Sequence, residues 1–91
     1  MKEWNDNFDR EILTADELQV SNLRVSIISE LIKARNNQKI SQRELERMSG
    51  IRQPIISRLE SGATDPMLDT VLKLLASLGM TLEVVPMKRV G

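Results

Sequence analysis

Apolar side chains recur three or four residues apart in two stretches of this chain, and this spacing predicts two amphipathic helices. The first covers residues 22–36, where Ser21 is a candidate N-cap. The second follows Asp65-Pro66 and ends at Gly79. We expect the buried stripes to be Leu23, Ile27, Ile28, Leu31 and Ile32 in the first helix, and Val71, Leu74, Leu75 and Leu78 in the second.

Two shorter helices are predicted between them. Ser41-Gln42-Arg43-Glu44 is a capping box, in which the serine hydroxyl accepts from the glutamate N–H and the carboxylate reaches back. This helix ends at Gly50, because glycine adopts the left-handed conformation of a tight turn. The next begins near Gln53, with Pro54 in its first turn, where the missing N–H costs nothing. The inward-facing side chains are expected to be Leu45, Met48, Ile56 and Leu59.

The two ends of the chain have patterns of their own. Thr14-Ala-Asp-Glu17 is a second capping box, which predicts a separate short helix up to about Gln19. After Gly79 the period changes to two, so a strand is expected up to Pro86. The side chains on its apolar side are Met80, Leu82 and Val84.

No other segment is a clear partner for this strand, so we expect it to pair with its copy in a second chain. Leu72, with Leu68 and Leu75, gives the last helix more apolar surface than one core requires, which also favours a dimer. The predicted fold is all-α, a five-helix bundle with a short C-terminal strand that pairs across a homodimer.

Composition narrows the chemistry. At 91 residues the chain has room for one domain, and it contains neither His nor Cys. The commonest general base, metal ligand and nucleophile are therefore missing, so an enzyme is disfavoured and no metal or cofactor is expected. No apolar stretch approaches the ~20 residues of a membrane helix, and no secretory signal is visible, so we expect a cytoplasmic protein without membrane contact.

Charge is distributed unevenly, although the chain is neutral overall. Residues 1–20 hold six acidic against two basic side chains, a net −4, whereas residues 21–62 hold eight basic against four acidic, a net +4. Such asymmetry suggests two different partners. We divide the chain into an acidic extension (1–20), a central domain (21–79) and a dimerisation strand with a tail (80–91).

Two short helices joined at a glycine and flanked by longer ones form the frame that places a recognition helix in the major groove of DNA. The chain closely resembles the Cro/C1-type (XRE) helix-turn-helix family over residues 23–79. The residues that carry this resemblance are Ile40-Ser41-Gln42-Arg43-Glu44-Leu45, Gly50-Ile51, Gln53, Ile56-Ser57-Arg58-Leu59-Glu60-Ser61-Gly62, Pro66, Leu72 and Leu78-Gly79. The resemblance implies a lambda-repressor-like bundle that binds double-stranded DNA.

The resemblance also implies roles for single residues. Gln42 resembles the residue that meets a phosphate and supports the recognition helix, and an ion pair between Arg35 and Glu60 would tie the first helix to it. Gln can pair with adenine and Arg with guanine, while an apolar side chain can touch a thymine methyl. For each DNA-facing position named below, the alternative is an ordinary solvated side chain. The DNA-facing positions are Arg52, Gln53, Ser57 and Arg58, with Ile55 beside them and Arg43, Lys39 and Thr64 suited to the backbone.

Two residues depart from the family pattern. Glu46 stands where a small residue usually lets the two motif helices pack closely, so its carboxylate must turn outward or the packing widens. Pro54 stands where many relatives have a polar base-reading side chain, so fewer bases are expected to be read directly.

The acidic extension contains the only two aromatic residues. Trp4, Phe8 and Ile12 share a four-residue spacing, which predicts a narrow apolar stripe on a helix edged by carboxylates. This stripe could dock on the chain's own bundle or on another protein with a basic surface.

A narrower resemblance bears on that choice. An acidic N-terminal extension, one helix-turn-helix and a final strand are similar to HigA-type antitoxins, on the residues Glu30-Leu-Ile-Lys-Ala-Arg35, Thr70-Val-Leu-Lys-Leu-Leu-Ala-Ser-Leu-Gly79 and Thr81-Leu-Glu-Val-Val85. This implies neutralisation of a small basic RelE/HigB-like ribonuclease toxin, for which Trp4, Phe8 and Ile12 are the candidate binding residues. It also implies repression of the antitoxin's own operon by a dimer on a palindromic operator. The alternatives are a stand-alone regulator of the phage-repressor type, a purely protein-binding module and, least favoured, an enzyme.

Overall fold

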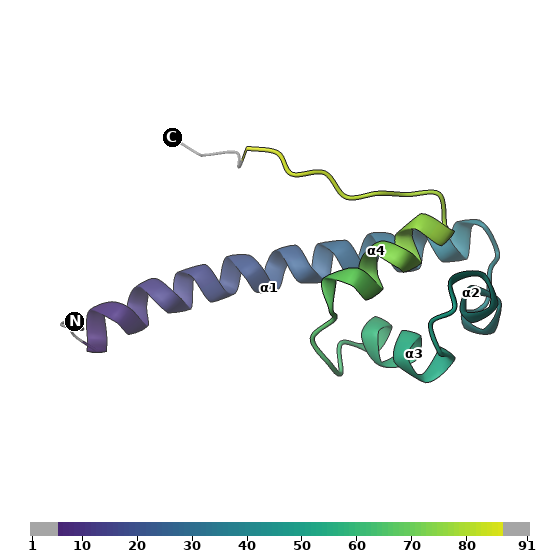
Figure 1. Ribbon diagram of the computed structural model, residues 1–91. Helices are drawn as coiled ribbons and strands as arrows, with labels where there is room; N and C mark the ends of the chain where they lie inside the picture. The colour runs from purple at the N-terminus through teal and green to yellow at the C-terminus, as the bar shows by residue number, and fades with distance from the viewer. Residues whose placement is uncertain (1–5, 87–91) are drawn as a thin grey trace.

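The computed structural model describes the backbone of residues 6–86 and the side chains of residues 17–86. The described chain forms four helices and no strand (Figure 1): α1 (Asp6–Asn37), α2 (Gln42–Ser49), α3 (Gln53–Ser61) and α4 (Leu68–Ser77). The all-α prediction is confirmed. The prediction of five helices is wrong, and the C-terminal strand is not formed within the described residues.

The missing fifth helix is explained by the continuity of α1. The predicted boundaries at Thr14 and Ser21 both lie inside this single helix of 32 residues. Residues 6–37 contain neither Gly nor Pro, so nothing interrupts the backbone hydrogen bonds, and Thr and Ser are tolerated in a helix interior as well as at its cap. At 1.5 Å per residue α1 is about 48 Å long. Its N-terminal half projects beyond the bundle (Figure 1).

The hydrophobic core lies between the C-terminal half of α1 and the three short helices. All four apolar residues of the predicted α4 stripe are buried, as predicted. Two other predictions are wrong: Leu23 is 62% exposed, because it lies toward the projecting half of α1, and Met48 is 40% exposed, because the short α2 buries only Leu45. The core consists of Leu31, Leu45, Ile56, Leu59, Val71, Leu74, Leu75 and Leu78.

Local signals determine the ends of α2 and the start of α3. The Ser41 hydroxyl accepts from the Glu44 N–H at 3.0 Å, and Gly50 has the left-handed φ of 81°. The second half of the predicted capping box is absent, because the Glu44 carboxylate accepts from Arg47 instead. Pro54 lies in the first turn of α3, as expected. The resulting turn of three residues fixes α3 against α2.

Residues 80–86, the tail, continue from α4 without regular secondary structure, to the same side of the bundle as the projecting half of α1 (Figure 1). A strand requires a neighbouring backbone to pair with, and the described chain supplies none to the tail. The tail exposes Met80 and Leu82 to 37% each and Val84 completely. Within residues 6–86, no helix has the length and apolarity that crossing a bilayer requires.

Candidate nucleic-acid interface

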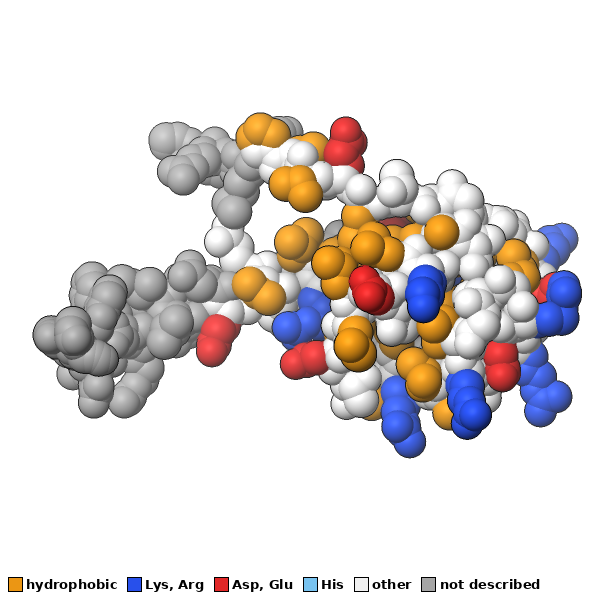
Figure 2. All heavy atoms as spheres, viewed as in Figure 1, with side chains coloured by type: hydrophobic (Ala, Val, Ile, Leu, Met, Phe, Trp, Pro, Cys, Tyr) orange, Lys and Arg blue, Asp and Glu red, His pale blue; other side chains and the backbone are white. Residues whose placement is uncertain are grey.

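Basic side chains gather on the surface of the two motif helices. Figure 2 shows them along the lower and right-hand edges of the bundle, where α2 and α3 lie in Figure 1. The exposed basic side chains of α2, of α3 and of the turns that precede them are those of Lys39, Arg43, Arg47, Arg52 and Arg58. Such a surface attracts the phosphates of a nucleic acid, which supply most of the sequence-independent binding energy.

An ion pair joins α1 to α3 behind this surface. The Nε and Nη2 atoms of Arg35 donate to the two carboxylate oxygens of Glu60, both at 2.7 Å. The Nη1 atom of Arg35 donates to the carbonyl of Ile40 at 2.9 Å. Only 13% of the Arg35 side chain and 8% of the Glu60 side chain are exposed. The pair implied by the family resemblance is thus present, and it is bidentate and largely shielded from water.

Two glutamine side chains extend this ion pair to the start of α3. Gln42 donates to Glu60 Oε1 at 2.9 Å, and Gln53 donates to Gln42 Oε1 at 2.7 Å. Because a carboxylate can only accept, Glu60 fixes the amide orientation of Gln42, which in turn fixes that of Gln53. Gln53 keeps its Oε1 and one N–H for a further partner, the pair of groups that matches the adenine edge.

The family resemblance implies that Gln42 meets a phosphate and supports the recognition helix. The hydrogen bonds of Gln42 to Gln53 and Glu60 agree with the supporting role, and the phosphate contact stays a prediction. The sequence provided a partial indication that Gln42 and Gln53 interact, because each lies in the first turn of a motif helix. Their direct hydrogen bond depends on how α2 and α3 pack.

The remaining predicted contacts lie on or beside the same face. Arg43, Arg52 and Arg58 are exposed, Ser57 is half-buried, and Ile55 is 46% exposed. In the described part of the chain, Arg52 and Arg58 form no ion pair, so their guanidinium groups are available to a ligand. Lys39 and Thr64 are exposed as well.

Sequence reasoning missed the part that Arg47 plays in this surface. Arg47 pairs with Glu44 one turn earlier, and this hydrogen bond lowers the pKa of the Glu44 carboxyl from its ordinary value. The spacing of three residues is the usual signal for such a pair. A shallow hollow opens beside it, lined by Arg43, Glu46, Arg47, Gln53 and Pro54.

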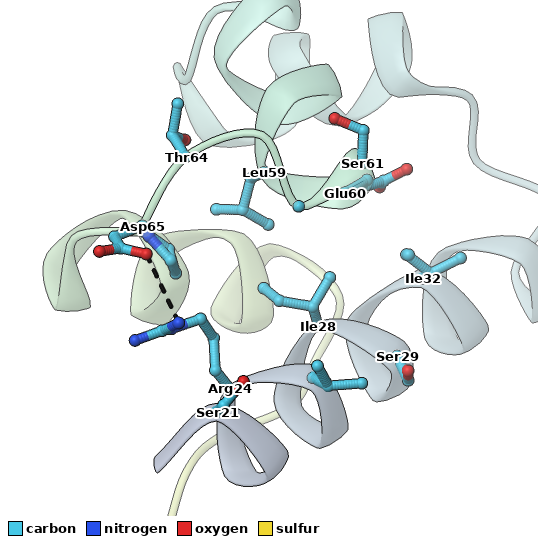
Figure 3. A pocket seen from close by; sticks show the side chains of 13 residues that line it. Ser21, Arg24, Ile28, Ser29, Ile32, Leu59, Glu60, Ser61, Thr64 and Asp65 are labelled. Atoms are coloured by element: carbon cyan, nitrogen blue, oxygen red, sulfur yellow. Dashed lines mark ion pairs between the residues drawn. The ribbon is translucent and has the colours of Figure 1, made fainter. Parts of the chain in front are cut away.

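A second groove lies between α1 and the connection from α3 to α4 (Figure 3). Ile28, Ile32 and Leu59 point into it, and the Arg24–Asp65 ion pair of 3.5 Å crosses it. Both charged side chains are well exposed, so the pair contributes little to stability. Among residues with described side chains, no cluster of three or more carboxylates is placed to hold a metal ion.

The predicted toxin-binding residues are only partly covered by the structure. Trp4 lies outside the described residues. Phe8 and Ile12 belong to α1, but their side chains also lie outside the described part. Phe8 and Ile12 thus lie one turn apart on the same helix, and their contacts with a toxin stay a prediction.

Comparisons with known proteins show which family this chain belongs to. The sequence model of the helix-turn-helix family matches residues 31–85. A Haemophilus influenzae protein described as an uncharacterized HTH-type transcriptional regulator is 51% identical over 85 residues, which are 93% of this chain and 86% of that protein. A solved structure described as a toxin-antitoxin module from Streptococcus pneumoniae matches with a TM-score of 0.69 and 52% identity, over 96% of this chain and 97% of that one.

The chain belongs to the helix-turn-helix family of the XRE type, a family of DNA-binding transcriptional regulators. Its similarity to a chain of a toxin-antitoxin module extends well beyond the motif, since it covers nearly the whole length of both chains.

Proposed function

We propose that this protein is a HigA-type antitoxin of the cytoplasm. It represses its own operon as a dimer and neutralises a small basic ribonuclease toxin of the RelE/HigB type. The observation that carries the proposal is the 52% identity, over nearly the whole chain, to a chain of a toxin-antitoxin module. The charge distribution supports it, because the acidic extension and the basic motif helices suit a basic protein and a nucleic acid respectively.

In the DNA-bound state, α3 lies in the major groove and its N-terminal turn faces the base edges. Gln53 reads an adenine with the oxygen and N–H that its bond to Gln42 leaves available. Arg58 reads a guanine, and Arg52 and Ser57 lie on the same face. Ile55 touches a thymine methyl group. Arg43 contacts a phosphate, so affinity falls steeply as the salt concentration rises.

Replacing Gln53 or Arg58 with Ala tests this assignment. Each substitution should weaken binding to the operator upstream of the gene about 5- to 150-fold, because a good bidentate base contact is worth about 1–3 kcal/mol. Fluorescence anisotropy at a fixed salt concentration measures the effect. Lys73→Ala is the matched control, because Lys73 is exposed on α4, outside the motif helices. Unchanged affinity of both motif variants would contradict DNA reading by α3.

The toxin is proposed to bind the acidic extension and the projecting half of α1. Residues 1–20 carry a net charge of −4, which complements a basic partner. Trp4, Phe8 and Ile12 supply the apolar anchors at a spacing of four residues. Beyond these residues α1 exposes Leu18 and Val20 to 62% and 54%, apolar area that the bundle leaves uncovered.

Co-purification from cells that express the neighbouring gene tests the role of the extension. The full chain should retain a small basic protein, whereas a chain lacking residues 1–20 should lose it. Trp4→Ala with Phe8→Ala in the full chain provides a second variant that leaves the length of α1 unchanged. Operator binding is the control for folding in both cases. Equal recovery of the basic protein with all three chains would refute the role of the extension, and the absence of any such neighbouring gene would favour a stand-alone regulator.

The dimer is proposed to form through the tail and the outer face of α4. Leu72 is 37% exposed, and the period of two in the tail brings Met80, Leu82 and Val84 to one side. Antiparallel pairing of two tails satisfies the backbone groups that a single tail leaves unpaired. Figure 2 shows apolar side chains gathered on the bundle next to the tail and others on the tail itself, which supports burial against a second chain.

A further inference from the structure

The hollow beside the Arg47–Glu44 pair contains one charged side chain, Glu46, that has neither a partner among the described residues nor a role in the proposed DNA contacts. It is half-buried and lines the hollow together with Arg43, Arg47, Gln53 and Pro54. Its neighbour on α2, Glu44, is paired with Arg47. The Glu46 carboxylate forms no hydrogen bond or ion pair with a residue whose side chain the structure describes.

Pro54 leaves the first turn of α3 without a hydrogen-bonding side chain at a position where many relatives have one. It is exposed and follows Gln53 in the first turn of α3, the part of a recognition helix that contacts base edges. A proline side chain has neither a donor nor an acceptor, so position 54 of α3 adds no polar contact to a base edge. Glu46 and Pro54 line the same hollow.

We propose that Glu46 determines sequence specificity by accepting a hydrogen bond from the N4 amino group of a cytosine opposite Pro54. The inference rests on the proposed DNA-binding function. A carboxylate can only accept, and the major-groove edges of guanine and thymine present acceptors at the corresponding positions, so both are repelled. Adenine presents a donor next to the N7 acceptor, whereas cytosine presents its donor without a neighbouring acceptor.

A basic neighbour of Glu46 makes a negative charge tolerable in this place. A carboxylate close to DNA is repelled by the phosphates, and Arg43, which lines the same hollow, offsets part of this repulsion, whereas the charge of Arg47 is already paired with Glu44. The remaining phosphate repulsion cancels part of the energy of the hydrogen bond to cytosine. Glu46 therefore contributes to specificity mainly by disfavouring the wrong bases, and adds little to affinity for the right one. The two departures from the family pattern, a glutamate for a small residue and a proline for a polar reader, thus compensate for each other.

Selection from a random DNA library tests the proposal with the full-length protein. We expect the wild-type protein to select one strongly preferred cytosine in each half-site, next to the bases read by Gln53. In titrations, changing this cytosine to thymine should weaken wild-type binding about 5- to 150-fold. The same change should alter binding of Glu46→Ala less than about twofold, and Glu46→Gln should shift the preference toward adenine, the base with which glutamine pairs.

Glu44→Gln is the matched control, because it removes one negative charge from the same helix and frees Arg47 while leaving Glu46 and Pro54 in place. It should change affinity for all sequences alike and keep the preferred cytosine. If Glu46→Ala selects the same cytosine as the wild type, the proposal is overturned while DNA reading by α3 stands. If the wild type selects no motif at all, the proposed DNA-binding function fails together with it.

Discussion

We expect Arg35→Ala to lower the free energy of unfolding by about 3–5 kcal/mol, the loss typical of a shielded charge deprived of its partner. The Glu60 side chain, only 8% exposed, would retain a single hydrogen bond from Gln42 in place of three charge-neutralising or polar contacts. The carbonyl of Ile40 would lose its donor as well. Urea unfolding followed by circular dichroism measures the change. A thermal midpoint lower by more than about 10 °C should accompany it.

The matched control for this experiment is Arg24→Ala. Arg24 also joins α1 to a distant part of the chain through an ion pair, but its side chain is 41% exposed and that of Asp65 is 84% exposed. Its loss should cost less than about 1 kcal/mol. Replacing Arg35 with Met and Glu60 with Leu together should cost less than Arg35→Ala alone, because no charge is left without a partner. Equal stability of Arg35→Ala and Arg24→Ala would contradict a structural role for the Arg35–Glu60 pair.

The helix-turn-helix was predictable because its signals are local. Ser41 begins α2, Gly50 ends it, and Pro54 marks the first turn of α3, each through the chemistry of one residue or one turn. The stripe of four apolar residues in α4 was equally clear. The family resemblance supplied the Arg35–Glu60 pair, which no local pattern contains.

The ends of the chain were harder to predict because cap residues are compatible with more than one structure. Thr14 and Ser21 suit an N-cap, but without Gly or Pro nearby α1 continues through both. The period of two in the tail describes side chains, whereas a strand requires a second backbone. The hydrogen bond between Gln42 and Gln53 depends on the packing of α2 against α3, which the sequence pattern does not specify.

The continuous α1 connects the proposed toxin-binding region to the proposed DNA-binding surface. Its N-terminal half contains residues 6–20 of the acidic extension, while Arg35 in its last turn holds Glu60 and, through Gln42, the proposed base reader Gln53. The two proposed binding surfaces are nevertheless separate, because the start of α1 and the helices α2 and α3 lie at opposite ends of the molecule (Figure 1). This separation fits a protein that binds a toxin and an operator with different surfaces.

The largest effect on operator binding is expected from Leu82→Asp combined with Val84→Asp. Both side chains are exposed in the single chain, at 37% and 100%, so the substitutions should leave the four helices intact. In a dimer they would place two carboxylates from each chain in the proposed apolar interface, where burial of a charge is strongly unfavourable. Light scattering coupled to gel filtration should therefore report a monomer.

A monomer binds one half-site at a time, so affinity for the full operator should fall roughly 10²- to 10⁴-fold through loss of the second, linked contact. Affinity for an isolated half-site should not change, because α3 is untouched. Thr81→Asp with Val85→Asp is the control, since it adds the same charges on the other side of the tail and should leave the dimer intact. If Leu82→Asp with Val84→Asp stays dimeric and binds the full operator as the wild type does, the tail is not the dimer interface.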